Sequence, residues 1–183
     1  MFLTLVFPHD YMVEETELPS TDGGIKHLFF PGATQRGGTS GILIRVTPYA
    51  NKEWIGTFAR GYSSPAGVSG VFSCPSPKSL CVVSAGQGYI VQVDSPDNWD
   101  MVQASPITDV RIIFDQGLII FANFTEIYAY GMEGLLWTTQ RLCSDELKIK
   151  SISSDIIYGT GWDALTNAMT DFRISVYSGR LLS

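Results

Sequence analysis

Charged side chains are scarce in this sequence. They make up 16% of its 183 residues, against about 25% in an average soluble protein, so we expect much of the surface to be uncharged. The charges that are present sum to -6, with a sequence pI near 4.8. Such a field repels phosphate groups, which disfavours binding to nucleic acid or to an anionic membrane, and it attracts basic partners.

Metal-binding and cross-linking residues are rare as well. The sequence has two histidines and three cysteines, and Cys74, Cys81 and Cys143 form no C-x-x-C pair, which argues against a zinc site. Cys74 and Cys81 flank the turn-like segment 75–79, a spacing compatible with a cross-strand disulfide in an oxidising compartment. The alternative, which we favour, is a pair of free thiols that behave as small apolar side chains.

The sequence also lacks a long apolar run. Residues 1–7 are apolar, but they have no basic flank or small-residue cleavage site and stop at Pro8, so they are too short for a signal peptide or a membrane span. The absence of a targeting signal favours a cytoplasmic location. We expect residues 1–7 to form a structural strand that joins the last unit of the fold.

No catalytic or cofactor-binding motif stands out. A G-x-S-x-G sequence is absent, and His27 has the apolar neighbours of a packed histidine. Segment 32–39 has the glycine spacing of a P-loop, but Gly38 stands in place of the lysine and a strand is expected from Ile42. We interpret this segment as a hairpin loop and expect no cofactor.

One acidic segment has the composition of a calcium loop. Asp94, Asp97 and Asp100 supply the hard oxygen ligands that calcium prefers. The order of residues in an EF-hand loop is missing, and Asp, Asn, Pro and Ser are also the residues of tight turns. We therefore favour a turn and keep the calcium site as the alternative.

Strand patterns dominate the rest of the chain. Segments 42–46, 89–93 and 172–176 alternate between apolar and polar residues, as half-buried strands do. Segments 80–83 and 117–122 are almost continuously apolar, which is typical of strands buried on both faces. We expect these two to be inner strands.

Little room remains for helices, because 18 glycines and 9 prolines interrupt the chain at short intervals. Only segments 16–20 and 163–171 look helical or irregular, and neither has a sustained helical stripe. The sequence therefore predicts an all-β protein.

A short pattern recurs along the chain. A strand, a short link and then a tryptophan occur three times, ending at Trp54, Trp99 and Trp137, and a degenerate fourth copy ends near Gly179. Each copy has strand-like segments upstream, so a unit of roughly forty residues holds about four short strands. That is the content of one blade of a β-propeller.

On this pattern the chain resembles the β-propeller superfamily over residues 42–182. Trp99-Asp100 and Trp162-Asp163 are WD dipeptides, and segment 129–137 is similar to the turn and tryptophan of quinoprotein-type repeats. The resemblance implies a small array of about four antiparallel blades, with a β-sandwich or an open barrel as the alternative. We divide the single domain into units 24–59, 68–104, 106–142 and 147–183.

Trp162 lies outside the repeating pattern. We interpret segment 158–167 as an insert in the last unit, where Gly159 and Gly161 permit unusual backbone angles. An outward Trp162 beside Asp163 would form a binding site, since tryptophan is enriched at interaction hot spots. The alternative is that Trp162 folds back over the sheet as a lid for the core.

The function that these features favour is a non-enzymatic interaction module whose partner is another protein. An acidic inhibitor or immunity-type protein that neutralises a basic partner is one concrete form. The alternative is a hydrolase or lyase in which carboxylates converge at the axis of the propeller. The candidates for that role are Asp94, Asp109, Asp155 and Asp163. The sequence leaves the oligomeric state open.

Overall fold

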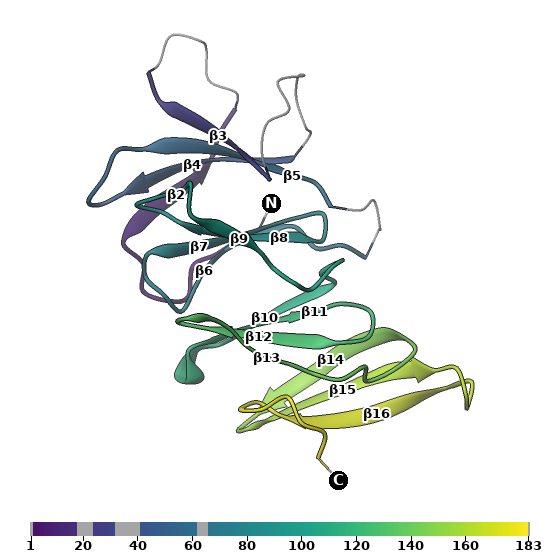
Figure 1. The fold of residues 1–183 in the computed structure, drawn as a ribbon. Coiled ribbons are helices and arrows are strands. Elements are labelled where there is room, and N and C mark those ends of the chain that lie inside the picture. The colour runs from purple at the N-terminus through teal and green to yellow at the C-terminus, as the bar shows by residue number, and fades with distance from the viewer. Residues whose placement is uncertain (1, 18–23, 32–40, 62–65, 183) are drawn as a thin grey trace.

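The computed structural model describes residues 2–17, 24–31, 41–61 and 66–182. Strands form four separate sheets in this part of the chain, and the one helical element is a 3-10 turn, η1 (Phe114–Gln116) (Figure 1). The all-β class is thereby confirmed. Within the same residues, no helix is long and apolar enough to cross a membrane.

The first sheet contains four strands, and their order across the sheet differs from their order along the chain. Its outer strand β3 runs parallel to β5, while the other pairs are antiparallel. From edge to edge it consists of β2 (Tyr11–Glu15), β4 (Gly41–Pro48), β5 (Trp54–Ala59) and β3 (Lys26–Phe30).

The second sheet adds the first strand of the chain to a four-stranded meander. Every residue of β7 is buried, which confirms the inner strand predicted at 80–83. From edge to edge the sheet consists of β1 (Phe2–Thr4), β6 (Gly70–Ser73), β7 (Ser79–Ser84), β8 (Gln87–Gln92) and β9 (Trp99–Met101).

The third and fourth sheets are antiparallel meanders. The third consists of β10 (Asp109–Ile113), β11 (Leu118–Ala122), β12 (Ile127–Gly131) and β13 (Gly134–Thr138). All of β11 is buried, as predicted for 117–122. The fourth consists of β14 (Asp145–Ser153), β15 (Ile156–Asp163) and β16 (Ala168–Ser175).

The four sheets stack face to face in a row, with an apolar core between each neighbouring pair. Phe30, Trp54 and Tyr89 lie in the core between the first and second sheets. Phe121 belongs to the core between the second and third sheets, and Ile157 to the core between the third and fourth. Figure 1 places the first and fourth sheets at opposite ends of this row.

The N-terminal segment forms a strand, as predicted, but the prediction of its partner was wrong. β1 pairs in parallel with β6 of the second sheet, not with the last unit. Because β6 would otherwise expose an unpaired backbone edge, it is a favourable partner for an extended segment. Phe7 follows this strand, is buried and stacks on Phe114 with ring centroids 5.8 Å apart.

The segment that we expected to be a loop around Trp162 is a regular hairpin. β15 continues to Asp163 and pairs with β16 along its whole length, so the irregular region is limited to the turn between them. The glycines have a packing role instead. An ideal Cβ on Gly159 would lie 2.1 Å from the ring of Phe172, and one on Gly161 would lie 2.3 Å from Cys143 Sγ.

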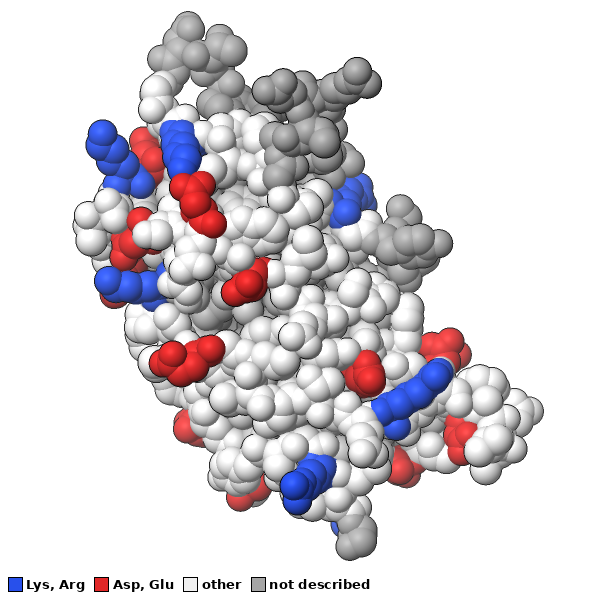
Figure 2. Space-filling view, viewed as in Figure 1, with Lys and Arg blue, Asp and Glu red and all other residues white. Residues whose placement is uncertain are grey.

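The surface agrees with the low charge content. Figure 2 shows Lys, Arg, Asp and Glu side chains scattered over a face that is mostly uncharged. The ion pairs among the described residues are largely exposed, for example Lys150 with Asp171 at 3.1 Å. Such pairs contribute little to stability, so the three apolar cores hold the sheets together.

Candidate functional site

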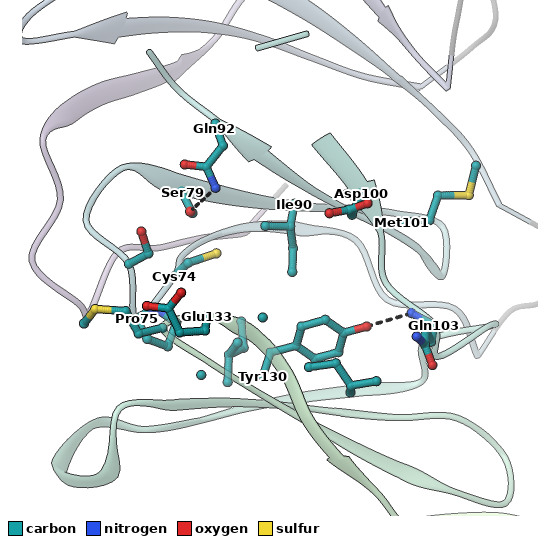
Figure 3. Close-up of a pocket in the computed structure, with 16 residues that line it drawn as sticks. Cys74, Pro75, Ser79, Ile90, Gln92, Asp100, Met101, Gln103, Tyr130 and Glu133 are labelled. Carbon is teal, nitrogen blue, oxygen red and sulfur yellow. Dashed lines mark hydrogen bonds between the residues drawn. The ribbon is translucent and has the colours of Figure 1, made fainter. Parts of the chain in front are cut away.

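A cleft of about 460 Å³ opens between the second and third sheets (Figure 3). Its floor reaches the core between these sheets, with Cys74 and Ile90 on one side and Ile119 and Tyr130 on the other. An apolar floor with a few polar groups around it is typical of ligand pockets, and this volume lies in their usual range of about 300–1,000 Å³.

The rim of the cleft carries negative charge. Asp100 comes from β9 of the second sheet, and Glu133 comes from the turn between β12 and β13 of the third sheet. Figure 3 shows these carboxylates on the two sheets that flank the opening. The described residues that line the cleft include no Lys, Arg or His. The local field therefore favours a cation.

Two apolar side chains of the third sheet stand exposed at the same opening. The exposed fractions are 62% for Met132 and 37% for Leu135. Met101 of β9 also borders the cleft, but its strand partner Tyr89 lies in the core between the first and second sheets, so its side chain belongs to the opposite face of the second sheet. Methionine is flexible and polarisable and adapts to varied contact surfaces. Exposed apolar groups gathered beside polar ones mark interaction sites more often than isolated apolar residues do.

Two hydrogen bonds fix the walls of the cleft. The backbone N–H of Gln103 donates to Tyr130 Oη at 3.0 Å, which links the segment after β9 to β12. Gln92 Nε2 donates to Ser79 Oγ at 2.9 Å within the second sheet. Both walls are therefore held in place by groups of the chain itself.

The buried groups of the cleft are not activated for chemistry. Burial raises the pKa of Cys74 to about 12, so its thiol stays protonated at neutral pH. Burial is also the largest cause of the raised pKa of Tyr130. A protonated thiol and a protonated phenol are poor nucleophiles and poor bases.

The three tryptophans of the predicted repeat fall into two groups. Trp54 donates its indole N–H to the carbonyl oxygen of Val93 at 3.0 Å, and Trp137 donates to Val176 at 2.9 Å. Each bond joins one sheet to the next. Trp99 is half-buried against the core between the first and second sheets.

The calcium candidates are not brought together. Asp94 pairs with Lys78 at 3.4 Å and Asp97 pairs with Lys26 at 2.7 Å, while Asp100 lines the cleft. Across the described residues, no three His, Cys, Asp or Glu side chains are grouped as a metal site would require.

Cys74 and Cys81 are free thiols in the structure, as is Cys143. Cys74 and Cys81 belong to the same buried cluster between the second and third sheets. Burial raises the pKa of Cys81 well above its ordinary value. The arrangement is that of apolar core thiols rather than of a disulfide.

The carboxylates considered for a hydrolase or lyase have separate partners. Asp109 accepts from Arg111 Nε at 2.9 Å, and Asp155 accepts from Tyr177 Oη at 2.8 Å. Asp163 accepts from the backbone N–H of Leu165, and Asp94 pairs with lysine as described above. The four do not converge on one point.

Trp162 is half-buried in β15, opposite Met169 and on the face of the fourth sheet that points away from the third. Asp163 stabilises the following turn through Leu165. Neither residue lies in the cleft, and their role in binding stays a hypothesis. The P-loop-like segment 32–39 lies outside the described residues.

Sequence reasoning missed Tyr130 and Glu133 as site residues. The turn at 131–134 was visible as part of a quinoprotein-like segment, and it is this turn that forms one rim of the cleft. Nothing in the sequence indicated that Asp100 would face it from another sheet.

No protein-family model matches this chain, and comparison with curated proteins gives no match either. The geometry of the cleft is therefore the basis for a functional proposal.

Proposed function

We propose that this chain is a non-enzymatic interaction module that binds a basic segment of another protein at the cleft between its second and third sheets. The observation that carries the proposal is the composition of the opening. Met132 and Leu135 are exposed beside Asp100 and Glu133, and the described residues of the lining include no Lys, Arg or His.

Each part of the opening has a role in such binding. Met132, Leu135 and the apolar floor supply area that a partner would bury, which provides most of the affinity. The two carboxylates select for positive charge and speed the encounter, because complementary charge acts mainly on specificity and association rate. The net charge of -6 extends the same preference to long range. An acidic inhibitor or immunity-type protein would use these features to neutralise a basic target.

We also propose that the four sheets are units of one open, propeller-like array. The Trp54–Val93 and Trp137–Val176 bonds support this, because both span 39 residues. The proposed units 68–104 and 106–142 each hold the four sequential strands of one sheet. Rigid arrays of this kind present loops and edge strands for binding.

Peptide binding tests the proposed function. A panel of peptides that combine Lys or Arg with apolar residues is titrated by isothermal calorimetry, with acidic peptides of the same length beside them. We expect some basic peptides to bind and the acidic ones not to bind. Asp100→Asn with Glu133→Gln should weaken binding more than Asp97→Asn with Asp171→Asn, which removes the same charge elsewhere.

Two results would contradict the proposal. If none of the basic peptides binds, the chain is not a module of this kind. If both double variants lose affinity equally, the attraction is a general effect of net charge and the cleft is not the site.

A further inference from the structure

The bond between Trp137 and Val176 belongs to a larger contact. Trp137 lies in β13 opposite Ala129, a residue of the core between the third and fourth sheets. Its ring covers Gly179, where an ideal Cβ would lie 2.5 Å from the indole. The third sheet therefore inserts one indole against the turn that follows β16 in the fourth sheet.

The equivalent position in the second sheet is occupied by Asp100. Ala129 is two residues before the end of β12, and Ile90 is two residues before the end of β8. The strand partner of Ala129 is Trp137, and the strand partner of Ile90 is Asp100. Ile90 packs toward the third sheet just as Ala129 packs toward the fourth.

Trp99, the neighbour of Asp100, does not replace the missing indole. It lies opposite Val91 and faces the first sheet, where its ring meets Phe30 at a centroid distance of 5.5 Å. The interface between the second and third sheets thus has a carboxylate where the next interface has an indole.

The turn that would receive this indole is uncovered. Gly134 is a left-handed glycine at the start of β13, directly after the turn that follows β12, and Gly179 is one in the turn after β16, with φ of +105° and +64° respectively. Apart from Gly134 itself and its two chain neighbours, no described residue has an atom within 4 Å of an ideal Cβ on Gly134. The cleft of about 460 Å³ occupies this place and is lined by residues 131–135.

We propose that the cleft takes an indole ring from outside the chain, in the place that Trp137 fills at the next interface, and that Asp100 and Glu133 pair with a cation attached to it. The ring would lie on the backbone of Gly134, above the apolar floor formed by Ile119 and Tyr130. Its N–H would donate to a backbone carbonyl of the 131–134 turn, as Trp137 does to Val176.

The ligand class is therefore an indole on an alkyl stem that carries an ammonium or guanidinium group. Two sources present this chemistry: a free indolylalkylamine, or a tryptophan next to lysine or arginine in a partner protein. The second source rests on the proposed function. In that case the tryptophan and the neighbouring lysine or arginine are the partner's key side chains.

The probes are tryptamine, indole-3-propionate, and a short peptide containing Trp-Lys, each titrated by calorimetry against the full chain. We expect tryptamine to bind more tightly than the propionate, because the ring is the same and the charge is opposite. Asp100→Asn should reduce the affinity for tryptamine roughly two- to fivefold, the value of an exposed ion pair. Amide signals of residues 131–134 should shift on addition of tryptamine to the unmodified protein.

Asp100→Trp is the decisive variant, since it supplies the indole from within the chain. We expect this variant to lose tryptamine binding. Leu165→Trp is the matched control, because it adds an indole at a turn where the side chain is 96% exposed, and it should bind tryptamine like the unmodified protein. The amide shifts in the unmodified protein test the site even if Asp100→Trp does not fold.

The outcomes separate this inference from the proposed function. Tryptamine binding that shifts residues 131–134 and is lost in Asp100→Trp supports the indole site. If basic peptides bind but tryptamine does not, the indole site is wrong and the proposed function stands. If tryptamine binds at the cleft and no peptide does, the indole site stands with a free amine as ligand, and the proposed function fails. Tryptamine binding unchanged in a folded Asp100→Trp overturns the inference.

Discussion

Trp137 donates its indole N–H to the carbonyl oxygen of Val176 at 2.9 Å, and this bond ties the third sheet to the backbone of the fourth. Trp54 makes the same kind of bond to Val93 between the first and second sheets. Each tryptophan therefore adds a directional contact to an interface that is otherwise apolar, and apolar contact alone does not fix the relative position of two sheets.

The contribution of these hydrogen bonds to stability can be measured by replacing the indole with a smaller ring. Trp137→Phe and Trp54→Phe each leave a carbonyl without its donor, and we expect each to lower the free energy of unfolding by about 1–3 kcal/mol. Urea denaturation measures this loss. Tyr49→Phe, at an exposed position, is the control and should change stability by less than about 0.5 kcal/mol. Unaltered stability in both tryptophan variants would show that the bonds do not hold the sheets.

The contact of Phe7 with Phe114 predicts that the N-terminal segment contributes to stability. Phe7 is buried, and its backbone N–H donates to Ser73 Oγ at 2.8 Å. Phe7→Ala should cost about 3–5 kcal/mol, the usual range for a buried phenylalanine. Val6→Ala, at the exposed neighbouring position, should be nearly neutral. Removal of residues 1–7 should lower the melting temperature at least as much as Phe7→Ala, and an equally stable truncated protein would contradict the role of this strand.

The cysteines should be unreactive in the folded protein. Burial raises the pKa of Cys74 to about 12 and raises that of Cys81 well above its ordinary value. At pH 8 both remain thiols, and the thiolate is the reactive form. We expect Ellman's reagent to label none of the cysteines in native protein and all of them after denaturation. A Leu165→Cys variant should label at once, and rapid labelling of the unmodified native protein would contradict the burial.

His27 predicts a pH dependence of stability. Its ring stacks on Phe29 and forms a hydrogen bond with Thr57 Oγ1, and desolvation lowers its pKa below the ordinary histidine value of 6.5. The unfolded chain then binds a proton more readily than the folded one. Stability is highest above about pH 6.5 and falls as the pH drops through the lower pKa of the folded state.

A series of urea denaturations between pH 7.5 and 5 measures how steeply the free energy of unfolding falls with pH. His27→Gln keeps a polar side chain without the titration, so its slope in this range should be smaller. Equal slopes in the two proteins would show that His27 does not contribute to the dependence.

Short-range patterns in the sequence were sufficient to identify most strands. The continuous apolar runs at 80–83 and 117–122 are buried strands because they lie between two other strands with a sheet packed on either face. Alternation located β4, β8 and β16, although the segments 42–46, 89–93 and 172–176 do not coincide with the ends of these strands. The strand at Tyr11–Glu15 was missed, since Glu14 and Glu15 follow only two inward residues, Tyr11 and Val13.

The errors came from contacts between residues that are distant in sequence. Gly159 and Gly161 were interpreted as turn residues, yet Phe172 and Cys143 require their lack of a side chain. Sequence alone did not reveal these neighbours. The cleft was beyond prediction for the same reason, because Asp100 and Glu133 come from different sheets and become neighbours only when the sheets stack.

The pairing of β1 with β6 also determines how the protein would respond to mechanical force. The chain leaves β1, forms the whole first sheet, and returns to the second sheet at β6. Tension applied between Phe2 and Leu182 would therefore pass directly from β1 to β6 and onward through the second, third and fourth sheets. The first sheet would carry no load until the three residue pairs between β1 and β6 separate. This short strand would thus shield the first of the four sheets from extension.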